Sequence, residues 1–227
     1  MREEIGSTLQ MSSDLTNAIL TNQPAFGLNL AEPTLARFEK YYQLLLEHNP
    51  ILHLIGPMST NEFAVRHILE SLTLLRYLEK NARFADVGSG GGLPAIPCLL
   101  ARDDLMAVLI ESKEKKSKFL QSAVEELGIA NRVQVATRQF QEVEPAGCQF
   151  VTCRALDRFT EKLDRLLKWS MKRQILLFGG PSIREALKRH KASFNETLMP
   201  LSDQRYLFAV QQDRTYLTSK SYSRSRR

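Results

Sequence analysis

A cluster of glycines is the most informative chemical feature of this sequence. It follows an apolar run and comprises Gly88, Gly90, Gly91 and Gly92. Without Cβ atoms, such a loop turns sharply from a strand into a helix and lets a flat ligand lie against the main chain. Glu111 ends the next apolar run about 20 residues later, the spacing at which a carboxylate accepts hydrogen bonds from ribose hydroxyls. The pattern predicts a site for a nucleoside-containing cofactor, and an ordinary flexible turn is the alternative.

The order of the glycines narrows the choice of cofactor. A dinucleotide-binding loop has the order Gly-x-Gly-x-x-Gly, whereas here Leu93 takes the place of the third glycine, which disfavours NAD. Asp86 precedes the loop and is either a turn residue at the strand end or a carboxylate facing a cationic cofactor. The second interpretation favours S-adenosylmethionine, whose sulfonium and ammonium groups are positive.

Strands and helices alternate after residue 82. Short apolar runs predict strands at Phe84–Val87, Met106–Ile110, Val133–Ala136, Phe150–Cys153, Ile175–Phe178 and Tyr206–Val210. The segment Lys113–Leu127 has an apolar face at helical spacing and predicts a helix packed on the sheet. Such alternation is typical of an α/β fold with a doubly wound, mostly parallel sheet, here a domain over residues 83–212.

The segments outside this domain have a different character. Residues 1–28 show little periodicity and are expected to form a loosely ordered terminus. A capping pair of Asn29 with Glu32 predicts a helix that ends before Asn49-Pro50, and a second helical region spans Phe63–Leu78. Residues 29–82 should therefore form an N-terminal helical appendage. Residues 213–227 form a basic, polar tail.

Composition and charge bound the class of protein. The 227 residues carry a formal charge of +6, and the basic excess lies entirely after residue 153, which is compatible with a polyanion-binding face or with ordinary solvated helices. We expect a cytoplasmic protein, because no apolar run is long enough for a membrane span and the opening residues lack the order of a signal peptide. A monomer is the expected state, although no sequence feature bears on it. The three cysteines form no Cys-x-x-Cys pair, so neither a disulfide framework nor a metal site is expected.

Several longer motifs resemble one known family. They are Asn49-Pro-Ile-Leu-His-Leu-Ile55, Arg66-His67-Ile-Leu-Glu70-Ser71-Leu72, Asp86-Val-Gly-Ser-Gly-Gly-Gly-Leu-Pro-Ala-Ile-Pro97, Glu111-Ser112, Lys115-Lys116, Phe119-Leu120, Glu126-Leu-Gly128 and Arg154-Ala155. Over about residues 35–180 the chain resembles the GidB/RsmG family, which methylates N7 of a guanine in 16S rRNA. The resemblance implies a Rossmann-like class I methyltransferase fold, S-adenosylmethionine as cofactor, and 16S rRNA or the small ribosomal subunit as partner.

The resemblance also implies the cofactor contacts. Together with the loop residues above, the expected set is Asp86, Gly88, Gly90, Gly92, Leu93, Glu111, Gln139, Phe140 and Arg154. The chain departs from the family pattern at several positions. Gln139-Phe140 stands where the family has Ala-Glu, His53-Leu54-Ile55 replaces Asn-Leu-Thr, Ala95 replaces a glycine and Phe178 replaces a lysine.

Three residues are candidates for catalytic roles. Arg66 would contact phosphate or base, His67 would orient the target, and Arg154 would contact the cofactor or RNA. Alternatively, Arg66 and His67 lie on a helix surface with Glu70 pairing locally, and Arg154 forms a salt bridge across strand ends. Because guanine N7 has a free lone pair in the neutral base, methylation there needs no general base.

A group of lysines near the start of one helix is a candidate RNA contact. Its members are Lys113, Lys115, Lys116 and Lys118. Lysines at such positions pair with phosphates in RNA-binding proteins, although a solvated helix face explains the same residues. Three classes of function therefore remain: a 16S rRNA guanine-N7 methyltransferase, a methyltransferase for another RNA or a small molecule, and a non-catalytic RNA-binding relative.

Overall fold

The computed structural model describes residues 13–154 and 159–211, so the predicted basic tail at 213–227 lies outside the described residues. The strands are β1 Arg83–Val87, β2 Met106–Ile110, β3 Val133–Ala136, β4 Phe150–Arg154, β5 Gln174–Gly179, β6 Ser193–Leu198 and β7 Tyr206–Gln211. The α-helices are α1 Asp14–Asn22, α2 Glu32–Leu52, α3 Thr60–Phe63, α4 Glu70–Leu72, α5 Ala95–Ala101, α6 Glu114–Glu126, α7 Phe159–Ser170 and α8 Pro181–Arg189. Short helical turns are η1 Gln23–Phe26, η2 Ala64–Leu69, η3 Thr73–Arg76, η4 Ala130–Arg132 and η5 Phe140–Glu142.

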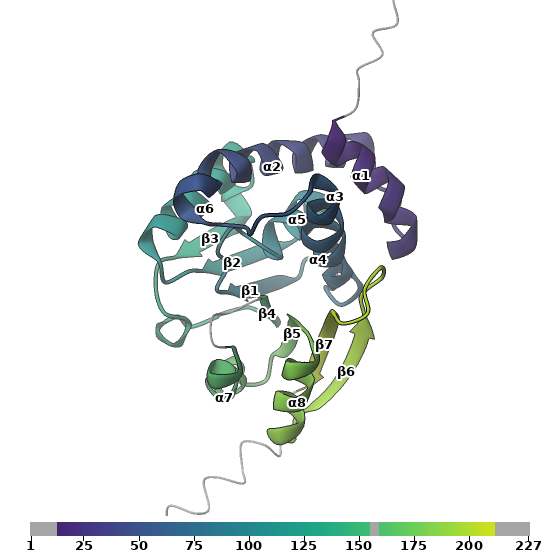
Figure 1. Ribbon diagram of the computed structural model, residues 1–227. Helices are drawn as coiled ribbons and strands as arrows, with labels where there is room; N and C mark the ends of the chain where they lie inside the picture. Colours follow the sequence, from purple (N-terminus) through teal and green to yellow (C-terminus); the bar gives the residue numbers. More distant parts are fainter. Residues whose placement is uncertain (1–12, 155–158, 212–227) are drawn as a thin grey trace, which may run out of the picture.

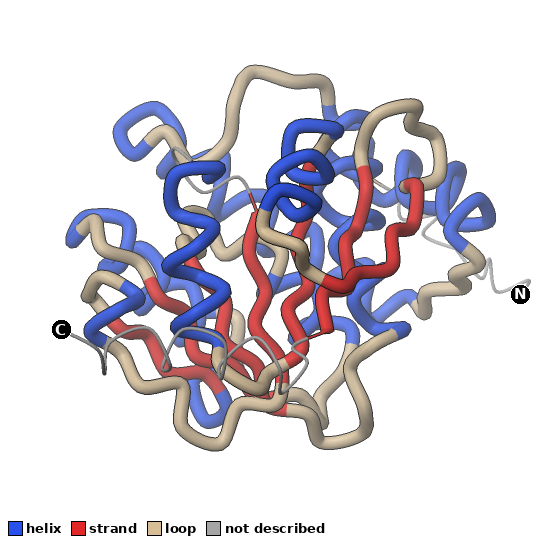
Figure 2. Tube along the Cα trace, turned by 90° about the horizontal axis from the view of Figure 1, so that it is seen from below, coloured by secondary structure: helices blue, strands red, loops and turns tan. Residues whose placement is uncertain are grey.

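One seven-stranded sheet in the order β3-β2-β1-β4-β5-β7-β6 forms the centre of the molecule (Figure 2). The first five strands of this order pair in parallel, and β7 pairs antiparallel with both β5 and β6. This arrangement confirms the predicted fold class and all six predicted strands. Strand β6 was missed, because its sequence Ser-Phe-Asn-Glu-Thr-Leu lies at the sheet edge, is largely exposed and has no apolar run.

The pleat of the strands divides the core into two layers. Phe84, Leu109 and Leu176 face the layer that holds the N-terminal helices, α5 and α6. Their neighbours Ala85 and Leu177 face the opposite layer, which holds α7 and α8. Figure 1 shows the two layers above and below the strands. Both faces of the parallel strands are therefore buried, which is why these strands read as continuous apolar runs.

The N-terminal segment is more ordered than the sequence predicts. Residues 14–26, expected to be part of a loosely ordered terminus, form α1 and η1 instead. Leu15 and Ile19 are buried beneath α1, and the Ser13 side chain accepts a hydrogen bond from the Thr16 amide at 3.1 Å. A helix of 9 residues with two buried positions has too little periodicity to be recognised without its partners.

Helix α2 differs from its predicted bounds at both ends. Ala31 rather than Asn29 precedes it, without a side-chain cap, and it continues through Pro50 to Leu52. Pro50 cannot donate the backbone hydrogen bond of a helical residue, and the helix ends soon after it, at Leu52. The predicted apolar face is confirmed, since Leu35, Phe38, Tyr42 and Leu45 are all buried.

No helix within residues 13–154 or 159–211 combines the length and apolar character needed to cross a membrane.

Candidate functional site

The glycine loop joins β1 to α5 at the carboxyl edge of the sheet. The amides of Gly88 and Ser89 both donate to the Ile110 carbonyl, at 2.9 and 3.2 Å, which ties the loop to the end of β2. Gly88 and Gly90 have φ angles of +73° and +55°. Side chains disfavour these angles, so the tight loop depends on glycine at both positions.

Tyr41 fixes the loop from the opposite side, a role that sequence reasoning missed. Its hydroxyl group donates to the Gly91 carbonyl oxygen at 2.8 Å, and the residue is fully buried beneath α2. Burial, followed by the nearby Asp86, raises the pKa of Tyr41 well above its ordinary value, so the phenol remains protonated and able to donate. The helical layer thus helps to shape the loop.

Glu111 lies where the sequence predicts, at the end of β2 beside the glycine loop. Its Oε2 accepts from the Gly90 amide at 3.0 Å and its Oε1 accepts from the Lys113 amide at 2.8 Å. Because a carboxylate offers about four lone-pair positions, each oxygen keeps acceptor capacity for a further donor. The residue is 93% buried by area yet lines the adjacent cavity, and therefore suits the recognition of sugar hydroxyls.

A cavity of about 290 Å³ opens over this edge of the sheet. Among the residues predicted to bind the cofactor, those lining it are Gly88, Gly90, Leu93, Glu111 and Arg154. The predicted pair Gln139 and Phe140 lines a neighbouring cavity of about 40 Å³, which shares Gly88, Ser112 and Lys162 with the first. Lys162, from α7, faces both cavities and was not singled out from the sequence, because its helix surface carries other basic residues.

Asp86, which the sequence predicts to face a cationic cofactor, is not among the residues that line the two cavities. It is fully buried in β1, and its Oδ1 accepts a hydrogen bond from the Thr152 hydroxyl group at 2.8 Å. Burial raises its pKa to about 7, and the neighbouring Glu111 adds to this shift. Asp86 thus lies under the loop, in the contact between β1 and β4, because the strand's pleat turns its side chain away from the cavity.

Replacing Asp86 by Asn should make the protein more stable relative to wild type as the pH rises. The folded state binds the Asp86 proton more tightly than the unfolded state, so the stability that this group contributes is complete below its ordinary pKa and is lost as the pH rises toward 7. Asn cannot ionise, and its carbonyl oxygen can still accept from Thr152. Urea unfolding gives the free energy of unfolding of both proteins at about pH 5 and about pH 8. The advantage of D86N over wild type should be larger at the higher pH by a few kcal/mol.

The exposed Glu142 supplies the control for this experiment. E142Q removes a carboxyl group that lies on η5, away from the β1–β4 contact. A difference between D86N and wild type that stayed the same at both pH values would show that the Asp86 proton is not linked to folding.

Gly92 also lies outside both cavities, although it was expected to contact the cofactor. Its φ angle is +93°, and an added Cβ would lie 2.3 Å from the Cδ1 atom of the buried Ile96. Its amide donates to the Ser89 carbonyl at 2.7 Å. Glycine is therefore required here for the close approach of the loop to α5.

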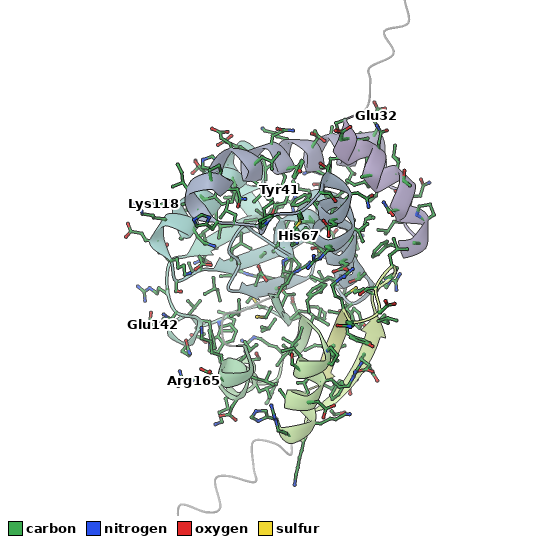
Figure 3. The ribbon with its side chains drawn as sticks, in the orientation of Figure 1. Glu32, Tyr41, His67, Lys118, Glu142 and Arg165 are labelled. Carbon is green, nitrogen blue, oxygen red and sulfur yellow. The ribbon has the colours of Figure 1, made fainter. Side chains whose placement is uncertain are left out.

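Arg66 and His67 lie on η2, a π-helical segment, and such segments are frequent at functional sites. His67 lines the cavity, and neither of its ring nitrogens has a hydrogen-bond partner among the described residues. Burial, together with Arg154 and Arg66, lowers the pKa of His67 to about 3, so its imidazole is neutral at physiological pH. Figure 3 shows the half-buried His67 near the centre of the view, with Lys118 and Arg165 toward its edge. Arg66 does not line the cavity.

Arg154 brings together residues that are far apart in the sequence. At the end of β4, its Nη2 lies 3.4 Å from the Oε2 of Glu70, and its guanidinium group lies over the Phe178 ring at 5.3 Å. Glu70 is 1% exposed and also accepts from the Nε of Arg205 at 2.6 Å. Glu70 therefore does not pair locally on a helix surface. Its partners lie 84 and 135 residues away, and no sequence spacing signals them.

The four predicted RNA-binding lysines divide between two environments. Lys113 and Lys116 line the cavity, and the Lys116 Nζ donates to the His53 carbonyl at 2.8 Å. Lys118 pairs with Glu114 at 2.8 Å on the exposed side of α6, and Lys115 is exposed. The structure thus brings two of these lysines to the cavity and leaves the others on a solvated helix face.

The residues of the cavity fit S-adenosylmethionine. The glycine loop leaves its main chain open to a ligand, since an added Cβ at Gly90 would meet only the Gly88 carbonyl, at 3.8 Å. Glu111 has acceptor capacity for ribose hydroxyls, and its negative charge suits a cationic ligand. Arg154 keeps a buried Nη1 that has no partner among the described residues, a donor suited to a carboxylate.

Solved structures share the fold. An RNA methyltransferase from Salinibacter ruber in complex with S-adenosyl-L-homocysteine superposes with a TM-score of 0.50 at 16% identity, covering 64% of this chain and 90% of that one. A Streptococcus agalactiae protein of the NADB-Rossmann superfamily has a TM-score of 0.51 at 19% identity, covering 64% and 70%. At this level of identity the likeness shows the fold alone.

Relatives found by sequence are more similar to this chain than these solved structures are. A protein from Chromobacterium violaceum named ribosomal RNA small subunit methyltransferase G is 38% identical over 144 residues, which are 62% of this chain and 68% of the relative. A protein of the same name from Neisseria meningitidis serogroup B is 37% identical over 156 residues, 69% of this chain and 72% of the relative. The family model described as rRNA small subunit methyltransferase G matches residues 34–215. The chain therefore belongs to the GidB family of rRNA small subunit methyltransferases.

Proposed function

We propose that this chain transfers the methyl group of S-adenosylmethionine to N7 of a guanine in 16S rRNA. The observation that carries the proposal is the cavity of about 290 Å³ at the sheet edge, which the glycine loop, Glu111, His67 and Arg154 line together. Membership of the GidB family supports the rRNA substrate, and the N7 position follows from the resemblance to that family.

Glu111, the glycine loop and Arg154 are the residues that would hold the methyl donor. Glu111 would accept from the ribose hydroxyls, while the main chain of Gly88 and Gly90 gives the donor a close, flat wall. Gln139 and Phe140 would extend the site through the adjoining cavity. When bound, the sulfonium group supplies an electrophilic methyl group.

His67 would orient the target base. Guanine N7 has a free lone pair, so no proton must leave before methylation, and catalysis then depends on the alignment of the reactants. The product base carries a positive charge on its ring. A neutral His67 can form a hydrogen bond with the base without adding a second positive charge, which agrees with its lowered pKa of about 3. Arg66, on the same π-helical segment, would contact the nucleotide's phosphate or base.

The lysines at the start of α6 would contact RNA phosphates. Lys113 and Lys116 lie at the cavity, and Lys115 and Lys118 continue the basic surface along the helix. Because such contacts release counterions from RNA, affinity for 16S rRNA or the small subunit should fall as salt concentration rises. A flat salt response would argue against this surface.

Mass spectrometry of 16S rRNA nucleosides provides the test of the proposed function. A strain that lacks the gene should lose one 7-methylguanosine from its 16S rRNA, and the wild-type chain supplied in trans should restore it. An unchanged 7-methylguanosine content would eliminate this substrate. Calorimetry then separates the other two classes, because a methyltransferase for another substrate binds S-adenosylmethionine and a non-catalytic RNA-binding relative does not.

A further inference from the structure

Glu70 is a buried carboxylate at the meeting point of three parts of the fold. It begins α4 in the helical layer, Arg154 ends β4, and Arg205 precedes β7. Each Glu70 oxygen has its own arginine: Oε2 faces the Nη2 of Arg154 at 3.4 Å, and Oε1 accepts from the Nε of Arg205 at 2.6 Å. A carboxylate that is 1% exposed requires such partners, because an unpaired buried charge is costly.

The contacts of Arg154 leave one part of its guanidinium group open. Glu70 engages Nη2, and the ring of Phe178 supports one face of the group at 5.3 Å. Nη1 is buried and has no hydrogen-bond partner among the described residues, while Arg154 itself lines the donor cavity. Buried polar groups are nearly always hydrogen-bonded, so a buried guanidinium nitrogen without a partner, in a residue that lines the cavity, points to a role beyond the salt bridge.

We propose that Glu70 is a positioning residue that holds Arg154 so that its Nη1 meets the carboxylate of the bound methyl donor. Arg205 steadies Glu70 from the opposite side, since the Glu70 oxygen that it binds is the one that Arg154 does not use. The carboxylate is the anionic group of S-adenosylmethionine and matches a guanidinium donor. The inference rests on the proposed use of that donor, and it does not depend on which nucleotide is methylated.

The first test measures the affinity of E70Q for S-adenosylhomocysteine, the demethylated donor, by calorimetry. Gln keeps the shape of Glu70 but loses its charge, so Arg154 is held less firmly and donor affinity should fall by about 10-fold. Affinity for 16S rRNA should stay unchanged, because the loss is confined to the donor cavity. E196Q is the matched control: it removes a carboxylate that pairs with Arg184 at 2.6 Å on β6, away from the cavity, and should bind the donor like wild type.

A double-mutant cycle with Arg154 separates positioning from a general structural role. If Glu70 acts through Arg154, the E70Q change should cost less than about twofold in an R154Q background, whereas a structural role would give the same loss in both backgrounds. Equal losses, or a donor affinity of E70Q within about twofold of wild type, would overturn the proposal.

A second variant covers the case in which E70Q does not fold. R205K retains the positive charge near Glu70 but lacks the Nε donor, and it should weaken donor binding about threefold, again less so in the R154Q background. An R205K protein with wild-type donor affinity would then contradict the proposal. The cycle uses donor binding only, so it can succeed even if 7-methylguanosine in 16S rRNA does not depend on this chain, and the two proposals fail separately.

Discussion

Replacement of Glu111 by Gln is expected to reduce affinity for S-adenosylmethionine by about 100-fold or more, since each hydrogen bond to a charged group contributes roughly 1.5–3 kcal/mol. Glu111 already accepts from the amides of Gly90 and Lys113. A Gln side chain presents one NH₂ group in place of an acceptor oxygen, so two N–H groups would face each other, one from Gln and one from an amide of the loop. The substitution thus removes the charge that we propose binds the sugar, and it disturbs the loop at the same time. Calorimetry with S-adenosylmethionine measures the loss of affinity.

Glu114 provides the matched control for E111Q. It is the first residue of α6 and is exposed, and it pairs with Lys118 at 2.8 Å. E114Q removes the same charge from the same region and should leave donor affinity unchanged. If E111Q bound the donor as tightly as E114Q does, the donor would not lie against the end of β2, and the proposed site would be wrong.

The second large effect is expected on stability, from replacement of Gly92 by Ala. An L-residue at φ +93° is strained, and the new methyl group would approach the Cδ1 atom of Ile96 to 2.3 Å unless Ile96 moves. Backbone strain of roughly 1–3 kcal/mol and overpacking of a similar size should together lower the free energy of unfolding by about 3 kcal/mol. Urea denaturation of the purified protein measures this loss.

A substitution at Gly27 separates backbone strain from overpacking as causes of the lost stability. Gly27 also has a positive φ angle, +67°, but nothing lies within 4 Å of an added Cβ. G27A should therefore show only the strain, about 1 kcal/mol. An equal loss in G27A and G92A would mean that Ile96 adjusts freely and that the close packing of the loop on α5 is unimportant.

Local sequence patterns were sufficient to predict the sheet and the residues that form one wall of the cavity. Buried parallel strands need continuous apolar runs, so β1 to β5 and β7 are visible in the sequence, and the edge strand β6 is not. The order of a parallel sheet also brings the ends of β1 and β2 together. The proximity of Gly90 and Glu111 therefore followed from spacing alone.

Asp86 and Gly92, which line neither of the two cavities, show the limit of a motif. Asp86 and Gly92 belong to the same run as Gly88 and Gly90, but the pleat of β1 directs Asp86 toward Thr152, and the turn into α5 presses Gly92 on Ile96. A motif gives the order of residues along the chain. Which of them face a ligand depends on backbone direction, which changes from one residue to the next.

The sequence by itself determined the α/β class, the glycine loop and its carboxylate partner, because these depend on periodicity and on contacts between consecutive strands. Only the tertiary structure decided that Glu70, Arg154 and Arg205 meet, and that His67 is half-buried and neutral near them. The physical reason is that charge pairing and desolvation act through space. They depend on which helices and strands pack together, and residues 84 and 135 positions apart leave no local trace of that packing.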